Sequence, residues 1–298
     1  MDLRRGGTNH PLEEQAEQLA AALPPLLVAA ERLASAVSLG VHGRRKAGMG
    51  ESFWQFRRYA PEDPSGAIDW RQSAKSQHLY VREREWEAAE AVWFWRDGSP
   101  TMQFKSQYSE VTKADRATVL GLALGSLLVR GGERIGLMGD GRGPATGKAT
   151  LRRIAHELTD LPPGKSALPP DAPVTRNSQL VWLSDFLSPI GETEAAMRKL
   201  SDAGLTGHLV HIVDPAEEDF PFEGRTRFEA MAGFEAEVFG RAENVQGSYR
   251  ARFNAHRDAL QALTRRLGWS YLGHRTDKRP ELALVALYAD IGGERQNI

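Results

Sequence analysis

Three oxygen-bearing side chains occupy alternate positions in one short loop of the sequence. Asp97, Ser99 and Thr101 follow the apolar run AVWFW at 91–95. If the loop is extended, alternate positions point to the same side and present one carboxylate with two hydroxyls. Pro100 favours this conformation because a proline keeps the residue before it out of the helical region. Oxygen-only ligands suit a hard cation, Mg²⁺ first and Ca²⁺ or Mn²⁺ as alternatives, so the loop predicts part of a metal site.

A second carboxylate follows a later apolar run. Asp185 comes directly after QLVWLS at 179–184. In an open α/β sheet, ligands bind at the carboxyl ends of the strands, so we expect Asp185 to lie near Asp97 and to join the metal site. Two alternatives involve no metal. Asp185 is also a suitable N-cap for a following helix, and the Asp97 loop can be a turn whose side chains bond local amides.

These residues require a scaffold of buried parallel strands. The runs AVWFW, RIGLMG, QLVWLS and HLVHIV are short and nearly continuously apolar, which is typical of strands covered on both faces. Helical periodicity separates them at 113–130, 148–160 and 192–203. The alternation predicts an α/β fold with a doubly wound, mostly parallel sheet. We further expect a proline-rich loop at 162–177, a helix at 248–267, a last strand WSYL and a C-terminal helix at 280–289.

The sequence divides into three zones. Residues 1–39 are predicted to be an N-terminal helical segment, with the helix at 13–38. Residues 40–90 are rich in Gly, Arg and aromatic residues, and the runs FWQFRRY and HLYVREREWE predict a small antiparallel β unit. Residues 91–298 form the α/β domain with its C-terminal helix.

Composition argues against several classes of partner. The formal net charge is −1, which gives no steering toward nucleic acid, and the arginines at 44–58 stand among acids that favour internal ion pairs. The absence of cysteine excludes disulfides and thiolate zinc sites. The uncharged stretch 18–30 is too short to span a bilayer and contains two prolines. We therefore expect a cytoplasmic protein with no membrane span, which reaches the inner membrane, if at all, through partners.

The metal-site residues resemble a known pattern. The loop DGSPTM at 97–102 resembles the D-x-S-x-S metal-ion-dependent adhesion motif of von Willebrand factor A domains, and SDF at 184–186 resembles the third motif of that family. The second motif is a lone threonine before a helix, for which Thr150 is the match and Thr146 the alternative. The resemblance implies a cation that protein ligands hold incompletely and that an acidic residue of a partner completes. The ligands it implies are Asp97, Ser99, Thr101, Thr150 and Asp185.

A narrower resemblance covers nearly the whole chain. The order of the run GVHGRRKAGMGESFWQFRRY, the D-x-S-x-[ST]-M loop, SDF and VDPAEEDFP is similar to that of the domain of unknown function 58 family. Members of that family resemble von Willebrand factor A proteins and commonly accompany a MoxR-type AAA+ ATPase. This implies an adaptor or chaperone-like partner of such an ATPase or of its client. The usual Y-x-x-G-D turn reads YAPED here, and the transmembrane helices of many members are missing.

An enzymatic alternative starts from the same loop. A strand-end aspartate beside Mg²⁺ is the nucleophile of haloacid dehalogenase-like phosphatases, and Asp97 would take that role. Such a loop needs a second aspartate two positions later as general acid, where this chain has Ser99. We therefore expect a binding protein that is not an enzyme.

Overall fold

The computed structural model describes residues 25–41, 53–59, 68, 70–75, 78–84, 91–160, 166–229 and 237–293. The chain separates into two compact units, residues 43–89 and the remainder. In the smaller unit β1 (Phe53–Arg58) pairs antiparallel with β2 (Tyr80–Arg84), and the short helix α3 (Trp70–Ser73) lies between them in sequence. The Ser73 hydroxyl accepts a hydrogen bond from the Tyr80 amide at 2.9 Å. The predicted antiparallel β unit is thereby confirmed.

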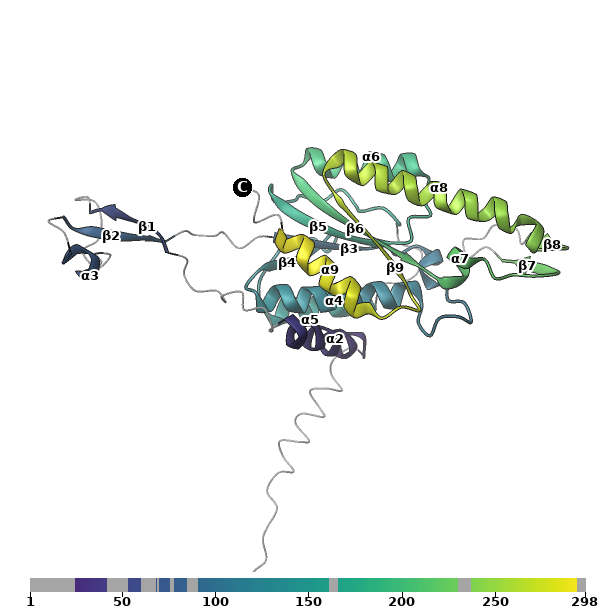
Figure 1. Cartoon of the computed structure of the whole chain (residues 1–298), viewed down its shortest axis with the longest axis horizontal. Coiled ribbons are helices and arrows are strands. Elements are labelled where there is room, and N and C mark those ends of the chain that lie inside the picture. The colour runs from purple at the N-terminus through teal and green to yellow at the C-terminus, as the bar shows by residue number, and fades with distance from the viewer. Residues whose placement is uncertain are drawn as a thin grey trace, which may run out of the picture. The chain divides into compact units, whose positions relative to one another are not determined.

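The larger unit is built on a five-stranded sheet in the order β4-β3-β5-β6-β9 (Figure 1). Every neighbouring pair in it is parallel. An isolated antiparallel bridge between Ile135 and Ala145 extends the edge beyond β4. The strands are β3 (Ala91–Arg96), β4 (Arg134–Leu137), β5 (Ser178–Ser184), β6 (Leu205–Val213) and β9 (Ser270–Arg275).

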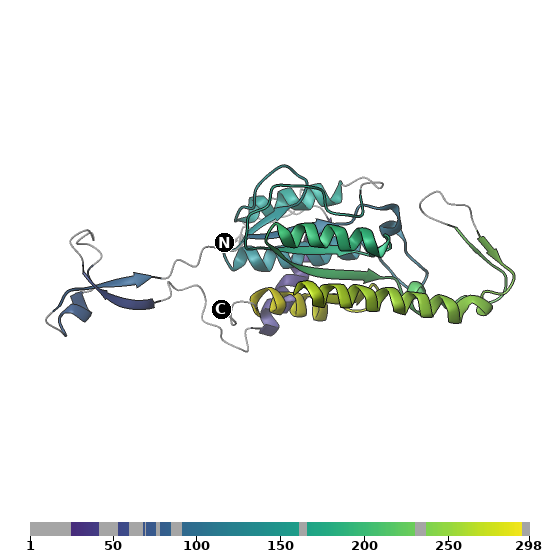
Figure 2. The same cartoon turned by 90° about the horizontal axis from the view of Figure 1, so that it is seen from above.

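Helices cover both faces of this sheet, as Figures 1 and 2 show. One apolar core packs the strands against α2 (Pro25–Val41), α4 (Lys113–Arg130), α5 (Lys148–Thr159) and α9 (Pro280–Gly293). The other packs them against α6 (Ile190–Asp202) and α8 (Glu243–Leu267). The buried strands β3 and β5 alternate their side chains between the two cores, which explains their continuous apolar runs. The prediction of a doubly wound sheet of von Willebrand factor A type is confirmed.

The structure adds elements that the sequence pattern did not predict. The acidic run after β6 forms the short helix α7 (Pro215–Asp219), and a hairpin of β7 (Thr226–Phe228) and β8 (Glu237–Phe239) follows it. The predicted N-terminal helix is present at α2, and its proposed first half, 13–24, lies outside the described residues. Within the described part of the chain, no helix has the length and apolar character needed to cross a membrane.

Candidate functional site

Asp97 lies at the carboxyl end of β3 and is completely buried. Its amide donates to the Leu183 carbonyl at 2.9 Å, which holds it against β5. Both carboxylate oxygens accept hydrogen bonds at 2.6 Å, Oδ1 from the Ser99 amide and Oδ2 from the Ser184 hydroxyl. Burial raises the pKa of Asp97, the nearby charge of Asp185 raises it further, and the two serines oppose the rise. A cation beside this carboxylate would relieve that unfavourable burial.

The hydroxyls of Ser99 and Thr101 converge next to Asp97. Their oxygens lie 2.9 Å apart, and both residues are partly exposed. Ser99 is extended as predicted, with φ −62° and ψ 154°, but a 3-10 turn, η2 (Pro100–Gln103), starts at the next residue. Proline has the fixed φ that suits the first position of such a turn. A tight turn therefore brings the two hydroxyls together, instead of the strand-like alternation expected from the sequence.

Asp185 lies at the carboxyl end of β5, as predicted, but it already has a cationic partner. Its Oδ2 accepts a hydrogen bond from Lys113 Nζ at 2.9 Å, and the Lys113 side chain is completely buried. Its Oδ1 accepts the Leu187 amide at 3.2 Å. The alternative of an N-cap does not apply, because Pro189 precedes the first residue of α6. Asp185 thus combines an Asx turn with one half of a buried ion pair.

Lys113 also binds a second carboxylate. Its Nζ lies 2.5 Å from Oε1 of Glu217 in α7. Burial acts to lower the pKa of Lys113, yet the charges and hydrogen bonds of Asp185 and Glu217 leave it raised, so the ammonium stays charged. Burial raises the pKa of Glu217, which Lys113 counteracts. One fixed ammonium therefore serves two carboxylates close to Asp97, the buried Asp185 and the partly buried Glu217.

Neither Lys113 nor Glu217 was predicted from the sequence, although the position of Lys113 carries one signal. Lys113 is the first residue of α4, after the N-cap Thr112. A positive charge is unfavourable there because the helix dipole is positive at its N-terminus. A lysine at this position therefore indicates a carboxylate partner from elsewhere in the chain. No local pattern identified Glu217 as the partner of Lys113, because Glu217 stands beside other carboxylates, Glu218 and Asp219.

Asp214 is the third aspartate at this end of the sheet, after β6. It is fully buried, and its carboxylate accepts the amides of Ala216 and Ser106 at 2.8 and 3.0 Å. Glu217 Oε2 accepts the Asp214 amide at 2.9 Å, which completes a capping box for α7. Glu217 thus uses one oxygen to build α7 and the other to bind Lys113. The acidic run is a structured part of the edge and not a solvated loop.

Thr150 does not reach this edge. It lies in the first turn of α5, and its hydroxyl donates to the Thr146 carbonyl at 3.1 Å. The bridge between Ala145 and Ile135, the second residue of β4, places the start of α5 near the amino ends of the strands. Asp97 lies at the carboxyl ends. The structure therefore does not bring Thr150 or its alternative Thr146 together with the other predicted ligands.

The far end of α5 confirms this direction. Arg96, which precedes Asp97, donates from Nη2 to the Leu158 carbonyl at 3.3 Å, and the Gly98 amide donates to Ser166 at 3.4 Å. Leu158 is eight residues after Thr150, a rise of about 12 Å along a helix. The last residue of α5, Thr159, is the threonine at this end, and its hydroxyl donates to the Ala155 carbonyl at 2.7 Å.

The donor set suits an open, incomplete cation site. Among the described residues, no group of three or more His, Cys, Asp or Glu side chains is placed to hold a metal ion. A cation at this edge would depend on the hydroxyls of Ser99 and Thr101 with the negative charge of Asp97 behind them. Asp185 contributes less than expected because Lys113 already balances it.

The five-stranded parallel sheet with helices on both faces is an α/β fold of von Willebrand factor A type. Residues 55–259 match the model of the family described as "Protein of unknown function DUF58", and the chain belongs to this family. Uncharacterized proteins of Mycobacterium tuberculosis and Mycobacterium bovis are 26% identical to it over 278 residues, covering 88% of this chain and 86% of theirs.

Two solved structures are also similar to the chain. An aerotolerance-related membrane protein from Bacteroides fragilis aligns with a TM-score of 0.43 and 16% identity, over 69% of this chain and 100% of that one. The conserved hypothetical protein BatB from Bacteroides thetaiotaomicron aligns with a TM-score of 0.41 and 15% identity, over 70% of this chain and 100% of that one.

Proposed function

We propose that this protein is a non-enzymatic binding module that captures an acidic residue of a protein partner through a divalent cation. The cation is Mg²⁺, with Ca²⁺ and Mn²⁺ as alternatives. The observation that carries the proposal is the pair of partly exposed hydroxyls, Ser99 and Thr101, set 2.9 Å apart beside the buried carboxylate of Asp97. Such hard oxygen donors suit these cations, which keep positions for water or for an outside carboxylate.

Each residue of the edge has a distinct part in this proposal. Ser99 and Thr101 would bind the cation, since they alone of the predicted ligands at this edge are partly exposed. Asp97 would supply negative charge from behind, because both of its oxygens already accept hydrogen bonds. Lys113 would hold Asp185 and Glu217 in place and limit the net negative charge that the cation meets. The bound cation supplies a Lewis-acidic contact to the partner's carboxylate.

The geometry disfavours the phosphatase alternative. A nucleophilic aspartate must present an accessible oxygen to phosphorus, whereas Asp97 has no exposed surface and each of its oxygens already accepts one hydrogen bond. Ser99 replaces the general acid that such an enzyme needs. The buried Lys113 ammonium is committed to two carboxylates and does not face a substrate. These features favour binding over turnover.

Metal binding is tested by removing one hydroxyl at a time from the full chain. Manganese titration followed by electron paramagnetic resonance measures the dissociation constant. We expect Thr101→Val to weaken binding about tenfold or more, equivalent to about 1.4 kcal/mol, and Asp97→Asn to weaken it further. Thr150→Val is the matched control, because it removes the same hydroxyl from the opposite end of the sheet and should leave binding unchanged.

Following the family resemblance, we propose a MoxR-type AAA+ ATPase, or its client, as the partner. A purified MoxR-type AAA+ ATPase would be captured on the immobilised protein in Mg²⁺ and in EDTA. Capture should require Mg²⁺ and should be lost in Asp97→Asn but kept in Thr150→Val. The proposal is wrong if manganese does not bind and capture is the same in EDTA, or if the Thr101 and Thr150 variants behave alike.

A further inference from the structure

The strand β9 has an open edge. It is the outermost strand on its side of the described sheet and pairs only with β6 there (Figure 1). The Thr276 amide donates to the Val213 carbonyl at 2.9 Å, so Thr276 turns its backbone groups toward β6. Because these groups alternate along a strand, those of Arg275, Gly273 and Tyr271 point to the outside. The edge therefore presents donors and acceptors to which another strand can bind.

A groove of about 990 Å³ runs along this edge. One wall is α8, through Phe253 and Arg257, and the other is α9, through Leu282 and Ala283. Gly273 lies exposed in the middle of the strand, where a Cβ atom would meet only the Tyr271 side chain, at 3.6 Å. A glycine within a strand leaves the backbone open to close approach by another chain.

The α9 wall carries apolar side chains that nothing in the described structure covers. This helix is apolar on nearly all sides, and it buries Leu284 and Leu287 in the core. On the outside, Leu282 is 80% exposed and Val285 41% exposed. A helix that is apolar all round is normally covered on all sides, so the outer face of α9 fits an interaction surface.

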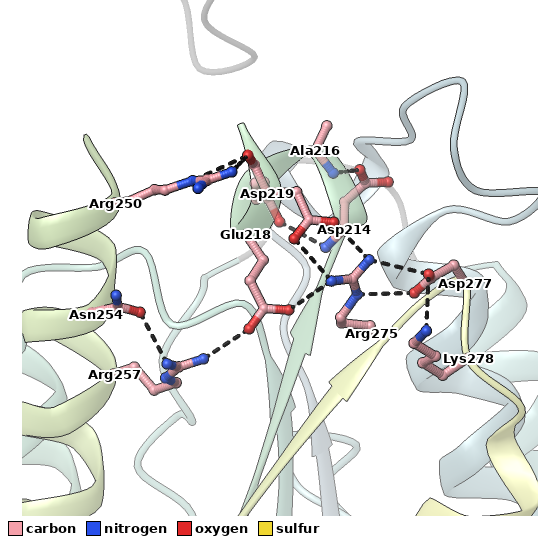
Figure 3. A network of polar contacts seen from close by, with 11 residues as sticks. Asp214, Ala216, Glu218, Asp219, Arg250, Asn254, Arg257, Arg275, Asp277 and Lys278 are labelled. Carbon is pink, nitrogen blue, oxygen red and sulfur yellow. Dashed lines mark hydrogen bonds and ion pairs between the residues drawn. The ribbon is translucent and has the colours of Figure 1, made fainter. Parts of the chain in front are cut away.

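Cationic side chains stand near both ends of the groove, among acidic residues such as Glu218 and Asp258 that also line it. After the carboxyl end of β9, the side chains of Lys278 and Arg279 are 67% and 85% exposed. Their local partners Asp277 and Glu281 form exposed pairs, which contribute little. In contrast, Glu218, Asp219 and Asp277 hold Arg275, and Glu218 also binds Arg257, as Figure 3 shows. Before the amino end of β9, α8 ends with the exposed residues Arg265 and Arg266, of which Arg266 pairs with Glu194 of α6 at 3.0 Å.

We propose that the β9 edge binds an extended peptide of a partner protein, which adds to the sheet as a further strand. Its apolar side chains would pack on Leu272 and Leu282, and its acidic residues would face Lys278 and Arg279 at one end and the α8 arginines at the other. Edge pairing of two copies is disfavoured, because an antiparallel arrangement would bring Lys278 and Arg279 next to Arg265 of the other copy. The binding mode is independent of the cation proposed above.

The proposal is tested by selecting binders to the full chain from a display library of random 12-residue peptides. We expect enrichment of sequences in which apolar residues alternate and acidic residues flank them. Leu282→Glu should weaken the binding of the selected peptides about tenfold or more. The double substitution Lys278→Glu and Arg279→Glu should weaken the binding of the acidic peptides. Val238→Glu is the matched control, because Val238 is also exposed, at 54%, but lies on β8.

A second measurement addresses the backbone. Peptide binding should slow hydrogen exchange of the amides of Tyr271, Gly273 and Arg275, and it should do so equally in the presence of EDTA. The proposal fails if no peptides are enriched, if Leu282→Glu and Val238→Glu have equal effects, or if these amides gain no protection. Sedimentation velocity tests whether two copies of the chain pair through this edge. If the chain without peptide is a dimer and Leu282→Glu dissociates it, the edge binds a second copy and the peptide proposal is wrong.

Discussion

Replacing Lys113 with methionine should make the stability of this protein strongly dependent on pH. The substitution keeps the apolar stem of the side chain but leaves Asp185 and Glu217, 3% and 19% exposed, without their shared ammonium. Breaking a buried pair by removing one partner costs about 3–5 kcal/mol, and two orphaned carboxylates place the loss at the upper end. Folded domains are stable by only about 5–15 kcal/mol, so the effect should be large in urea unfolding at pH 8.

The pH dependence follows from the sign of the protonation change. Without Lys113, Glu217 binds its proton more readily in the folded state than in the unfolded state, because burial raises its pKa. Stability of the variant should therefore rise as the pH falls from 8 toward 5, and the difference from the parent should shrink. The triple change Lys113→Met, Asp185→Asn and Glu217→Gln should restore much of the loss at pH 8.

Lys199→Met is the matched control for this experiment. Lys199 pairs with Asp171 on the surface, with side chains 66% and 76% exposed, and losing such a pair costs under about 1 kcal/mol. The reasoning is refuted if Lys113→Met destabilises no more than Lys199→Met, or if its deficit persists unchanged at pH 5.

Two further perturbations test the scaffold. Burial lowers the pKa of His208, which lies between Ser270 and Gln179, to about 4. As the pH falls, the unfolded state therefore takes up this proton first, and the stability of the folded protein should fall from about pH 7 toward pH 4. In His208→Gln, the urea midpoints at pH 7.5 and pH 5 should differ less than in the parent, and an equal difference would contradict this prediction. Gly207→Ala would place a Cβ atom 2.0 Å from the Trp269 ring, and we expect a loss of about 1–3 kcal/mol by thermal unfolding. Gly191 lies in α6, and a Cβ atom added there would meet no atom within 4 Å, so Gly191→Ala should stabilise the protein by up to about 1 kcal/mol. Equal effects of the two alanine substitutions would contradict this explanation by packing.

Much of the scaffold was predictable because its signals are local. A strand that both faces of a sheet cover must be apolar at every position, and AVWFW and QLVWLS show this pattern within a few residues. The same logic placed Asp97 and Asp185 at neighbouring strand ends, since carboxyl ends of parallel strands share one edge. The helix α7 was not predicted, although its start carries a local signal: Asp214 is an N-cap residue, Pro215 follows it, and Glu217 completes a capping box three residues later.

The direction of α5 was not readable from its sequence. A threonine that opens a helix looks the same at either end of a sheet, and only the antiparallel bridge at Ala145 carries the chain back to the amino ends of the strands. This single reversal removes Thr150 from the site. It also brings the other end of α5, at Leu158, next to Arg96.

The residues that end the buried strands, and the donor atoms that they offer there, can be read from the sequence alone, because strand periodicity and residue chemistry are local properties. The use of those donors depends on the tertiary structure. Lys113 meets Asp185 and Glu217 across 72 and 104 residues of chain, and no periodicity reports a contact at such separation. Long-range packing brings Lys113, Asp185 and Glu217 together away from most of the solvent, where electrostatic attraction is stronger than in water. Asp185, predicted as a metal ligand, therefore forms an internal ion pair with Lys113.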